Sequence, residues 1–349
     1  MSQMTFAAAI NDAMHIAMSS DPTVLAFGLG ICDPKAIFGT TIGLQEAFGK
    51  ARVFDMPISE NALTGVAVGA AIGGYKPVMV HQRMDFSLVS VDQIVNSAAK
   101  WFYMFGGTTP IPLVIRMIVG RGWGQGPTHS QALHAWFAHV PGLKVALPSS
   151  PADAKGLLLE SINDPNPVIF IEHRWLHNSL GEVPTGDHRV PLGLARTLAE
   201  GADITLVAIS LMASEALRAS QVLKRHGINC EVIDLRTARP IDWQTIETSV
   251  AKTGRLVALD IAHPTASLSA EIVAGISERC FGRLKSVPAR ICLPDHAVPT
   301  SQALTDGFYP SALDIVKVVA EMMGCAVPLD ELKDDCPHDV PGDWFRGPF

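Results

Sequence analysis

Three histidines near the middle of the chain have side chains that could act as acids, bases or metal ligands. They are His129, His134 and His139, and each lies five residues from the next. On one helix, a step of five residues turns the side chain by about 140°, so three such imidazoles point in different directions. We therefore expect no shared metal ion here, and we interpret His134 and His139 as structural residues.

Other stretches of the sequence match known chemical motifs only in part. His173 and His177 have the spacing of a zinc-protease helix, but Arg174 stands where that motif requires glutamate. The glycine-rich stretches 27–33 and 120–129 lack the third glycine of a dinucleotide-binding loop. The chain also contains neither the P-loop pattern nor the GxSxG pattern of serine hydrolases. We therefore expect none of these four chemistries.

Two further residues, together with His129, combine a reactive or aromatic side chain with a defined local setting. Glu60 follows Ser59, the expected N-cap of a helix over 60–72, where the helix dipole stabilises a carboxylate. Phe86 stands at the start of another expected helix, and His129 lies in a glycine-rich loop. Taken one at a time, each has an ordinary structural explanation, as a helix-start carboxylate, a core aromatic ring and a loop histidine.

Charge and composition exclude several classes of protein. The chain has 27 Lys and Arg residues against 34 Asp and Glu residues, a net charge of −7, so it lacks the basic excess of nucleic-acid-binding proteins. No apolar run approaches the roughly 20 residues needed to cross a bilayer, which predicts no membrane span. The N-terminal residues are typical of a helix and not of a signal peptide, which predicts a cytoplasmic protein. Six cysteines without CxxC spacing favour reduced thiols.

The elements that position these residues alternate between short β-branched runs and longer stretches rich in Ala and Leu. This alternation predicts an α/β fold with two parallel-sheet domains. In the first half, strands are expected near 24–26, 53–54, 77–80, 113–116, 145–147 and 168–171, with helices between them. In the second half, strands are expected at 204–209, 230–234, 256–260 and 289–292, with helices near 213–226, 243–252, 267–280 and 312–323.

The domain boundary is expected where the composition changes. Gly, Pro and polar residues collect at about 180–198, before a new expected strand. We therefore predict a first domain over 1–180, a linker over 181–198, a second domain over 199–324 and an extended tail over 325–349. The small residues of the helix over 60–72 allow close packing on every side, which predicts that this helix is buried.

Four segments in order carry a resemblance to a known family. They cover 55–78, with the sequence DMPISENALTGVAVGAAIGGYKPV, and then 85–101, 126–158 and 162–172. They resemble the beta subunit of the thiamine-diphosphate-dependent decarboxylase component of 2-oxo acid dehydrogenases, of the pyruvate and branched-chain types. The similarity continues through 231–260 and spans about 4–323. It implies a transketolase-like pyrimidine-binding domain followed by a transketolase C-terminal-like domain.

The resemblance implies roles for individual residues. Glu60 matches the glutamate that hydrogen-bonds the aminopyrimidine of thiamine diphosphate, and Phe86 matches the aromatic residue that lies against this ring. His129 matches a histidine near the substrate and the incoming lipoyl group, where a side chain that titrates near neutrality can deliver a proton. Many relatives hold a structural potassium ion by main-chain carbonyls, and the matching positions here are Leu113, Ser161, Asp164 and Asn166.

One motif of this family is absent from the chain. The family binds the diphosphate and its magnesium through a GDG motif in a separate alpha subunit, and this chain contains no GDG. The resemblance therefore implies half a site, an α2β2 heterotetramer with an alpha subunit, and a second domain that supports the interface and docks the lipoyl acyltransferase core. It also implies a small 2-oxo acid as substrate.

Some residues depart from the family pattern and leave alternatives open. Two acidic residues usual in the first loop are replaced here by Leu29 and Gly30, which puts the coupling of two active sites by proton relay in doubt. The stretches 126–129 and 301–310 favour transketolase-like relatives. Three hypotheses follow: a 2-oxo acid dehydrogenase subunit with lipoamide as acceptor, a split carboligase that makes an acyloin or an extended sugar, and a non-catalytic assembly subunit.

Overall fold

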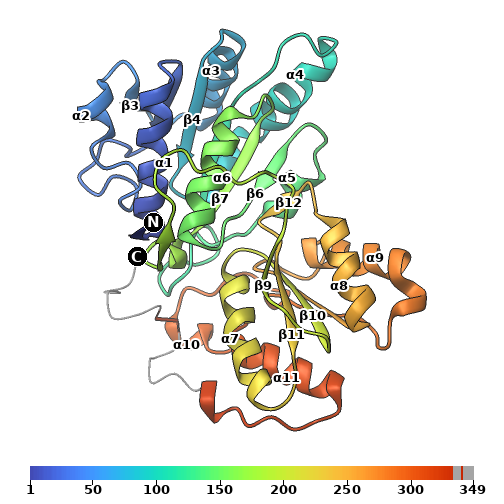
Figure 1. The fold of residues 1–349 in the computed structure, drawn as a ribbon. Coiled ribbons are helices and arrows are strands. Elements are labelled where there is room, and N and C mark those ends of the chain that lie inside the picture. The colour runs from blue at the N-terminus through green and yellow to red at the C-terminus, as the bar shows by residue number, and fades with distance from the viewer. Residues whose placement is uncertain (333–338, 341–349) are drawn as a thin grey trace. The chain divides into compact units, whose positions relative to one another are not determined.

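The structure is a computed structural model that describes residues 1–332 and 339–340. The chain divides into two compact units (Figure 1). The first comprises residues 1–120 and 136–192, and the second comprises 121–135 and 193 onward. The segment 121–135 therefore belongs to the second unit, although it lies between two parts of the first in the sequence. The sequence prediction of contiguous domains did not include this exchange.

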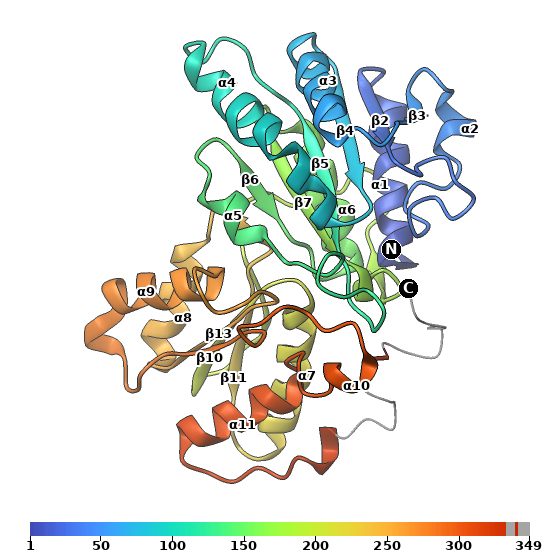
Figure 2. The same ribbon diagram turned by 180° about the vertical axis from the view of Figure 1, so that it is seen from behind.

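The first unit contains a parallel sheet. Six of its strands run in the order β6-β7-β5-β4-β2-β3. Their bounds are β2 (Val24–Gly28), β3 (Val53–Asp55), β4 (Lys76–His81), β5 (Val114–Val119), β6 (Lys144–Ala146) and β7 (Val168–His173). Strands β4, β5 and β7 are buried along almost their whole length, as expected for a parallel sheet covered on both faces (Figure 2).

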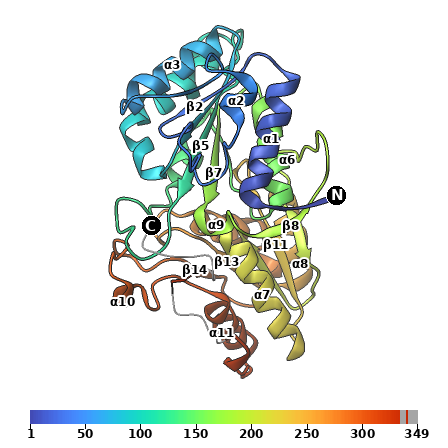
Figure 3. The same ribbon diagram turned by 90° about the vertical axis from the view of Figure 1, so that its left-hand side faces the viewer.

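Helices cover both faces of this sheet. On one face, α1 (Phe6–Ser20) packs against α6 (Pro151–Asn163), and α3 (Glu60–Ile72) and α4 (Ala99–Met104) lie on the other face (Figure 3). A 3-10 helix η1 (Met84–Ser90) and a π-helix η2 (Gln93–Ala98) precede α4. The other elements of this unit are α2 (Leu44–Phe48), the 3-10 helix η3 (Arg174–Leu176), and the antiparallel pair β1 (Ser2–Thr5) and β8 (Leu180–Val183). Helix α5 (His134–His139) begins in the second unit and continues in the first.

Helix ends in this unit show which capping signals act. The Thr5 hydroxyl accepts a hydrogen bond from the Ala8 amide at 3.1 Å, and the Ser150 hydroxyl accepts one from the Asp153 amide at 3.2 Å. Ser59 precedes α3 as predicted, but its side chain makes no capping hydrogen bond. The prediction that α3 is buried is wrong for this chain by itself, since Val66 is 55% exposed on its outer face.

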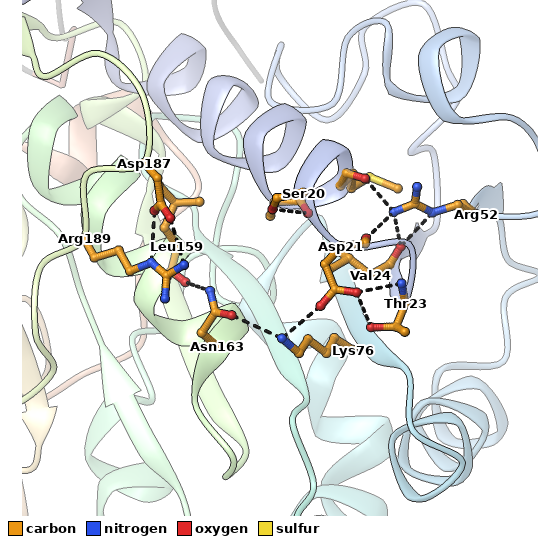
Figure 4. A network of polar contacts seen from close by, with 12 residues as sticks. Ser20, Asp21, Thr23, Val24, Arg52, Lys76, Leu159, Asn163, Asp187 and Arg189 are labelled. Atoms are coloured by element: carbon orange, nitrogen blue, oxygen red, sulfur yellow. Dashed lines mark hydrogen bonds and ion pairs between the residues drawn. The ribbon is translucent and has the colours of Figure 1, made fainter.

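A polar network closes the amino ends of β2 and β4 (Figure 4). Lys76 forms an ion pair with Asp21 at 3.0 Å and donates to Asn163 Oδ1 at 3.1 Å. The Asp21 carboxylate also accepts from the Thr23 amide and hydroxyl at 2.8 and 2.6 Å. Burial by itself raises the pKa of Asp21, but Thr23 and Lys76 outweigh it and lower the pKa to about 2. The Arg52 guanidinium donates to carbonyls at Met18, Asp21 and Val24, so this edge is held by side chains.

The second unit contains a five-stranded sheet in the order β14-β13-β10-β11-β9. Its strands are β9 (Arg196–Ala199), β10 (Ile204–Ala208), β11 (Cys230–Asp234), β13 (Leu256–Leu259) and β14 (Ala289–Ile291), of which only β9 pairs antiparallel. Its helices are α7 (Leu211–Arg225), α8 (Trp243–Thr253), α9 (Leu268–Cys280), α10 (Gln302–Thr305) and α11 (Ala312–Met323). Short elements β12 (Thr237–Arg239), η4 (Phe281–Arg283) and η5 (Asp330–Leu332) complete it.

The α/β fold is confirmed, and the differences from the predicted elements have physical causes. The strand expected over 113–116 continues to Val119, because the charge of Arg116 inside it is neutralised by Glu172 of β7. Residues 181–198, expected as a linker, include most of β8 and the start of β9. Most of the expected tail over 325–349 lies outside the described residues.

Two findings concern the whole described part of the chain. Among the described residues, no helix is both long and apolar enough to span a membrane. The five cysteines within that part are free thiols, and Cys230 and Cys280 are buried.

Candidate active-site residues

Glu60 is the first residue of α3, a short turn after β3. Its backbone carbonyl accepts a hydrogen bond from the Thr64 hydroxyl at 2.7 Å. The side chain is half-buried, and within the described residues its carboxylate has no hydrogen-bond or ion-pair partner. The N-terminal end of α3 stabilises this negative charge. Glu60 therefore presents a carboxylate whose hydrogen-bonding capacity is open to a ligand.

Phe86 lies in η1, directly after β4. The Phe86 amide donates to the Arg83 carbonyl at 3.2 Å, and the Ser87 and Ser90 hydroxyls donate to carbonyls three residues earlier. These bonds hold the tight turns of η1, and the Phe86 side chain in them is half-buried. Helix α3 packs against η1, so the first unit brings the elements that carry Glu60 and Phe86 into contact.

The loop after β2 contains Leu29 and Gly30, where the family pattern has acidic residues. The Ile31 amide donates to Asp55 Oδ1 at 2.8 Å, and the Thr41 hydroxyl donates to the Ile31 carbonyl at 2.9 Å. Gly30 has φ +74°, and a Cβ at Gly30 would lie 2.4 Å from Gln82 Nε2. An acidic side chain at this position would need a strained backbone and a displaced Gln82 amide. The conformation of this loop therefore does not accommodate an acidic side chain at position 30.

A buried charge cluster lies at the carboxyl end of this sheet. Arg116 Nε donates to Glu172 Oε1 at 2.6 Å, and His177 Nε2 lies 3.1 Å from Glu172 Oε2. Burial raises the pKa of Glu172, but Arg116 and His177 outweigh it and lower the pKa to about 2. Burial lowers the pKa of His177, so we assign a neutral imidazole that donates to a charged Glu172. Because all three residues come from β5, β7 and the turn after β7, the cluster connects the sheet to the segment that follows it.

Two arginines next to this cluster lie against one aromatic ring. The guanidinium carbons of Arg83 and Arg174 are 5.0 and 4.4 Å from the centre of the Phe38 ring, which is 6.0 Å from the His177 ring. Burial lowers the pKa of both arginines to about 10. Both remain charged at neutral pH, and the negative ring face of Phe38 favours them. Neither arginine is among the predicted site residues, because nothing in the sequence indicates that both contact Phe38.

His129 lies in the segment 121–135 and so belongs to the second unit. Its side chain is exposed, and its Nδ1 is 3.1 Å from the Thr128 hydroxyl. The His129 amide donates to the Gly126 carbonyl at 3.4 Å. The position of this imidazole is therefore set by the path of its own segment.

His134 ends the same segment and makes a buried contact. His134 Nε2 lies 2.9 Å from Asp260 Oδ1, and both side chains are almost fully buried. The backbone amides of Ala262 and Ser269 donate to the two Asp260 oxygens at 3.1 and 3.0 Å. His139, the other histidine interpreted as structural, is exposed at the end of α5.

The four carbonyls expected at a potassium site lie around the turn between α6 and β7. The Leu113 carbonyl accepts from the Val168 amide at 2.9 Å, and the Ser161 carbonyl accepts from the Asp164 amide at 3.3 Å. Asp164 Oδ1 accepts from the Asn166 amide at 2.9 Å, and Asp164 Oδ2 pairs with the Lys144 ammonium group. An ammonium group thus already neutralises this turn. Among the described residues, no group of three His, Cys, Asp or Glu side chains could hold a metal ion.

Comparison with protein families identifies the class of protein. The model described as transketolase, pyrimidine binding domain matches residues 2–178, and the model described as transketolase, C-terminal domain matches 193–315. A solved structure described as a split gene transketolase, inactive beta4 tetramer, matches with a TM-score of 0.75 at 22% identity and covers 92% of this chain and 98% of that chain. The chain therefore has the transketolase-like fold of thiamine-diphosphate-dependent enzymes.

Curated relatives narrow this class. The acetoin:2,6-dichlorophenolindophenol oxidoreductase subunit beta of Cupriavidus necator is 41% identical over 325 residues, which cover 90% of this chain and 96% of the relative. The mitochondrial pyruvate dehydrogenase E1 component subunit beta-2 of Oryza sativa subsp. japonica is 39% identical over 331 residues, covering 94% and 88%. The pyruvate dehydrogenase E1 component subunit beta of a Staphylococcus epidermidis strain is 39% identical over 318 residues, covering 91% and 98%. The chain belongs to this family of dehydrogenase E1 and acetoin oxidoreductase beta subunits, as the resemblance implied.

Proposed function

We propose that this chain is the beta subunit of a thiamine-diphosphate-dependent 2-oxo acid dehydrogenase that works with a separate alpha subunit. Family membership supports the reaction class, and the observation that carries the site is the half-buried carboxylate of Glu60 at the start of α3, which has no hydrogen-bond or ion-pair partner among the described residues. The relatives named above are dehydrogenase or oxidoreductase subunits, so they favour neither a split carboligase nor a non-catalytic assembly subunit.

Glu60 would hold the aminopyrimidine ring of the cofactor. A carboxyl group there can share a proton with a ring nitrogen. Phe86, on the neighbouring η1, would lie against the ring face and exclude water from it. When bound, thiamine diphosphate supplies the electron sink that allows carbon dioxide to leave a 2-oxo acid. This chain's contribution is the position of the ring and of one proton.

His129 would act on the substrate side. Its imidazole is exposed, so it is accessible to solvent and to a substrate, and an imidazole is a side chain that can carry a proton to either. We propose that it delivers a proton to the 2-oxo acid or to the acceptor that takes the acyl group. Lipoamide on an acyltransferase core is the acceptor that we favour.

The partner and ions complete this proposal. The chain has no GDG motif, so we assign the diphosphate and its magnesium ion to the alpha subunit of an α2β2 heterotetramer. A potassium ion at the carbonyls of Leu113, Ser161, Asp164 and Asn166 stays a prediction, as does the cytoplasmic location. The Lys144 ammonium group at Asp164 weakens the need for a cation at that turn.

A second candidate substrate is a 2-hydroxyketone of the acetoin type. It is favoured by the 41% identical relative, whose name specifies acetoin oxidation. Cleavage of acetoin also breaks a bond next to a carbonyl carbon, so the same residues could serve it.

The test is a substrate and acceptor panel on the chain co-purified with its alpha subunit. We expect release of carbon dioxide from a 2-oxo acid with either a lipoyl domain or dichlorophenolindophenol as acceptor. Dye reduction with acetoin, without carbon dioxide release, would favour the second candidate. Carbon dioxide release that occurs only with an aldehyde and yields a new carbon–carbon bond would contradict the dehydrogenase proposal.

A further inference from the structure

The segment 121–135 is glycine-rich and carries His129 between two attachment points on the second unit. Gly122, Gly124 and Gly126 all have positive φ, at +125°, +94° and +65°. Glycines in this conformation leave the backbone many alternatives when they are not held. The segment therefore depends on its attachment points for a single conformation.

The first attachment point is at the start of the segment. The Arg121 guanidinium lies 4.1 Å from the centre of the Tyr309 ring, and its Nε is 3.7 Å from Asp339 Oδ1. The Gly124 amide donates to the Thr300 carbonyl at 2.9 Å. Gly126 approaches Thr300 so closely that a Cβ would lie 2.4 Å from the Thr300 hydroxyl.

The second attachment point is the contact between His134 and Asp260. Asp260 is fixed by the Ala262 and Ser269 amides, which donate at 3.1 and 3.0 Å. The Ser269 hydroxyl in turn lies 2.7 Å from the Ser267 hydroxyl, at the start of α9. These bonds fix the position of the Asp260 carboxylate independently of His134. His134 Nε2 lies 2.9 Å from Asp260 Oδ1. Without this contact, the two backbone amides would be the remaining described partners of the buried Asp260 carboxylate.

We infer that His134 is a positioning residue whose contact with Asp260 holds the segment 121–135 on the second unit and thereby fixes His129. The inference rests on the proposed role of His129 and adds to it the residue that places the imidazole. His134 is five residues from His129 in the sequence, and no described contact joins their side chains directly. It acts through the path of the backbone between them.

Two amide substitutions separate this role from a general packing role. In His134→Gln the side-chain amide nitrogen occupies roughly the place of Nε2 and can keep the contact with Asp260. In His134→Asn it is one methylene short and cannot reach. Both are measured in the complex with the alpha subunit, by kcat and KM for the 2-oxo acid and by hydrogen exchange of peptides within 121–133.

We expect His134→Asn to lower kcat about tenfold or more, to change KM less than threefold and to speed exchange in 121–133. His134→Gln should keep kcat within about threefold of the wild type. Equal losses in the two variants, or unchanged exchange in His134→Asn, would overturn the inference. If the His134→Asn chain does not assemble, Asp260→Asn is measured in its place, with the same expectations for kcat and exchange.

A parallel His129→Gln variant separates this inference from the proposed function. Full activity in His129→Gln would show that the proposed role of His129 is wrong, whatever the exchange data show. An inactive His129→Gln together with a fully active His134→Asn would leave the role of His129 in place and would contradict the positioning role of His134.

Discussion

Each unit of the chain buries one histidine next to one carboxylate, and the two pairs are built differently. In the first unit, Glu172 contacts His177 and also forms an ion pair with Arg116, and all three residues are fully buried. In the second unit, Asp260 contacts His134 and two backbone amides, and no arginine of the described residues pairs with it. Glu172 compensates the buried charge of Arg116, whereas Asp260 accepts hydrogen bonds from two backbone amides.

The position of each pair in the chain adds to this difference. Arg116 and Glu172 lie in adjacent strands, so their pair fixes the sheet itself. Asp260 directly follows β13, and His134 closes a glycine-rich segment that carries His129. The same pair of residue types therefore stabilises the core in one unit and orders a functional segment in the other. This comparison predicts large stability effects in the first unit and smaller, local effects in the second.

The largest effect is expected from Glu172→Gln. The substitution leaves the Arg116 charge buried without its partner, which costs about 3–5 kcal/mol of unfolding free energy. Denaturant unfolding of the purified complex measures this cost, with Glu182→Gln as control, because Glu182 of β8 is exposed. The double variant Arg116→Met with Glu172→Leu should recover most of the loss, because it removes both charges. A loss below about 1 kcal/mol in Glu172→Gln would contradict the buried-cation account.

The next largest effect concerns how the stability of the first unit depends on pH. Burial lowers the pKa of His81, at the end of β4, from 6.5 to about 4. Below pH 6.5, His81 therefore binds a proton in the unfolded chain but stays neutral in the folded chain. The free energy of unfolding falls as the pH is lowered from 6.5 to about 4. A shift of this size corresponds to about 3 kcal/mol. His81→Leu should flatten the curve in this range.

The control for this prediction is His139→Gln, which replaces an exposed histidine of the same unit. It should leave the slope of unfolding free energy against pH unchanged between pH 6.5 and 4. In the second unit, the pKa values of the carboxyl groups of Asp260 and Glu231 are lowered. Their protonation therefore reduces the free energy of unfolding only at a more acidic pH. Pulse proteolysis should show the first unit opening at higher pH than the second, and the reverse order would contradict the comparison.

A smaller effect is expected from Gly126→Ala in the second unit. Alanine at φ +65° is strained and would meet the Thr300 hydroxyl at 2.4 Å, which together costs about 1–2 kcal/mol. Hydrogen exchange should rise in 121–133 while the sheet of the second unit keeps its protection. Gly307→Ala, which also has positive φ but open space around it, is the matched control for strain without the contact. Equal effects at both glycines would show that Thr300 does not hold the segment.

Local patterns in the sequence predicted much of the fold. The bounds expected for the helices over 60–72 and 312–323 agree with α3 and α11. Strand β5 was predicted too short, because a charged Arg116 usually ends a buried strand and its partner Glu172 is far away in the sequence. The π-helix η2 has no sequence signature that distinguishes it from an α-helix.

The candidate site was less predictable than the fold. Glu60 and Phe86 came from a motif match, and the structure adds that their elements are in contact. The contact of His134 with Asp260 could not be predicted, because it joins residues that share no local pattern. For the same reason, no local pattern indicates that 121–135 belongs to the second unit, because this assignment depends on tertiary contacts.

The central claim is that Glu60 serves a cofactor site that this chain shares with an alpha subunit. Carbon dioxide release from the preferred 2-oxo acid by the purified complex tests it, with Glu60→Gln compared against Glu46→Gln on the exposed face of α2. We predict a fall of at least about 100-fold for Glu60→Gln, with normal assembly by analytical ultracentrifugation, and no change for Glu46→Gln. An assembled Glu60→Gln complex within about twofold of wild-type turnover would contradict the account.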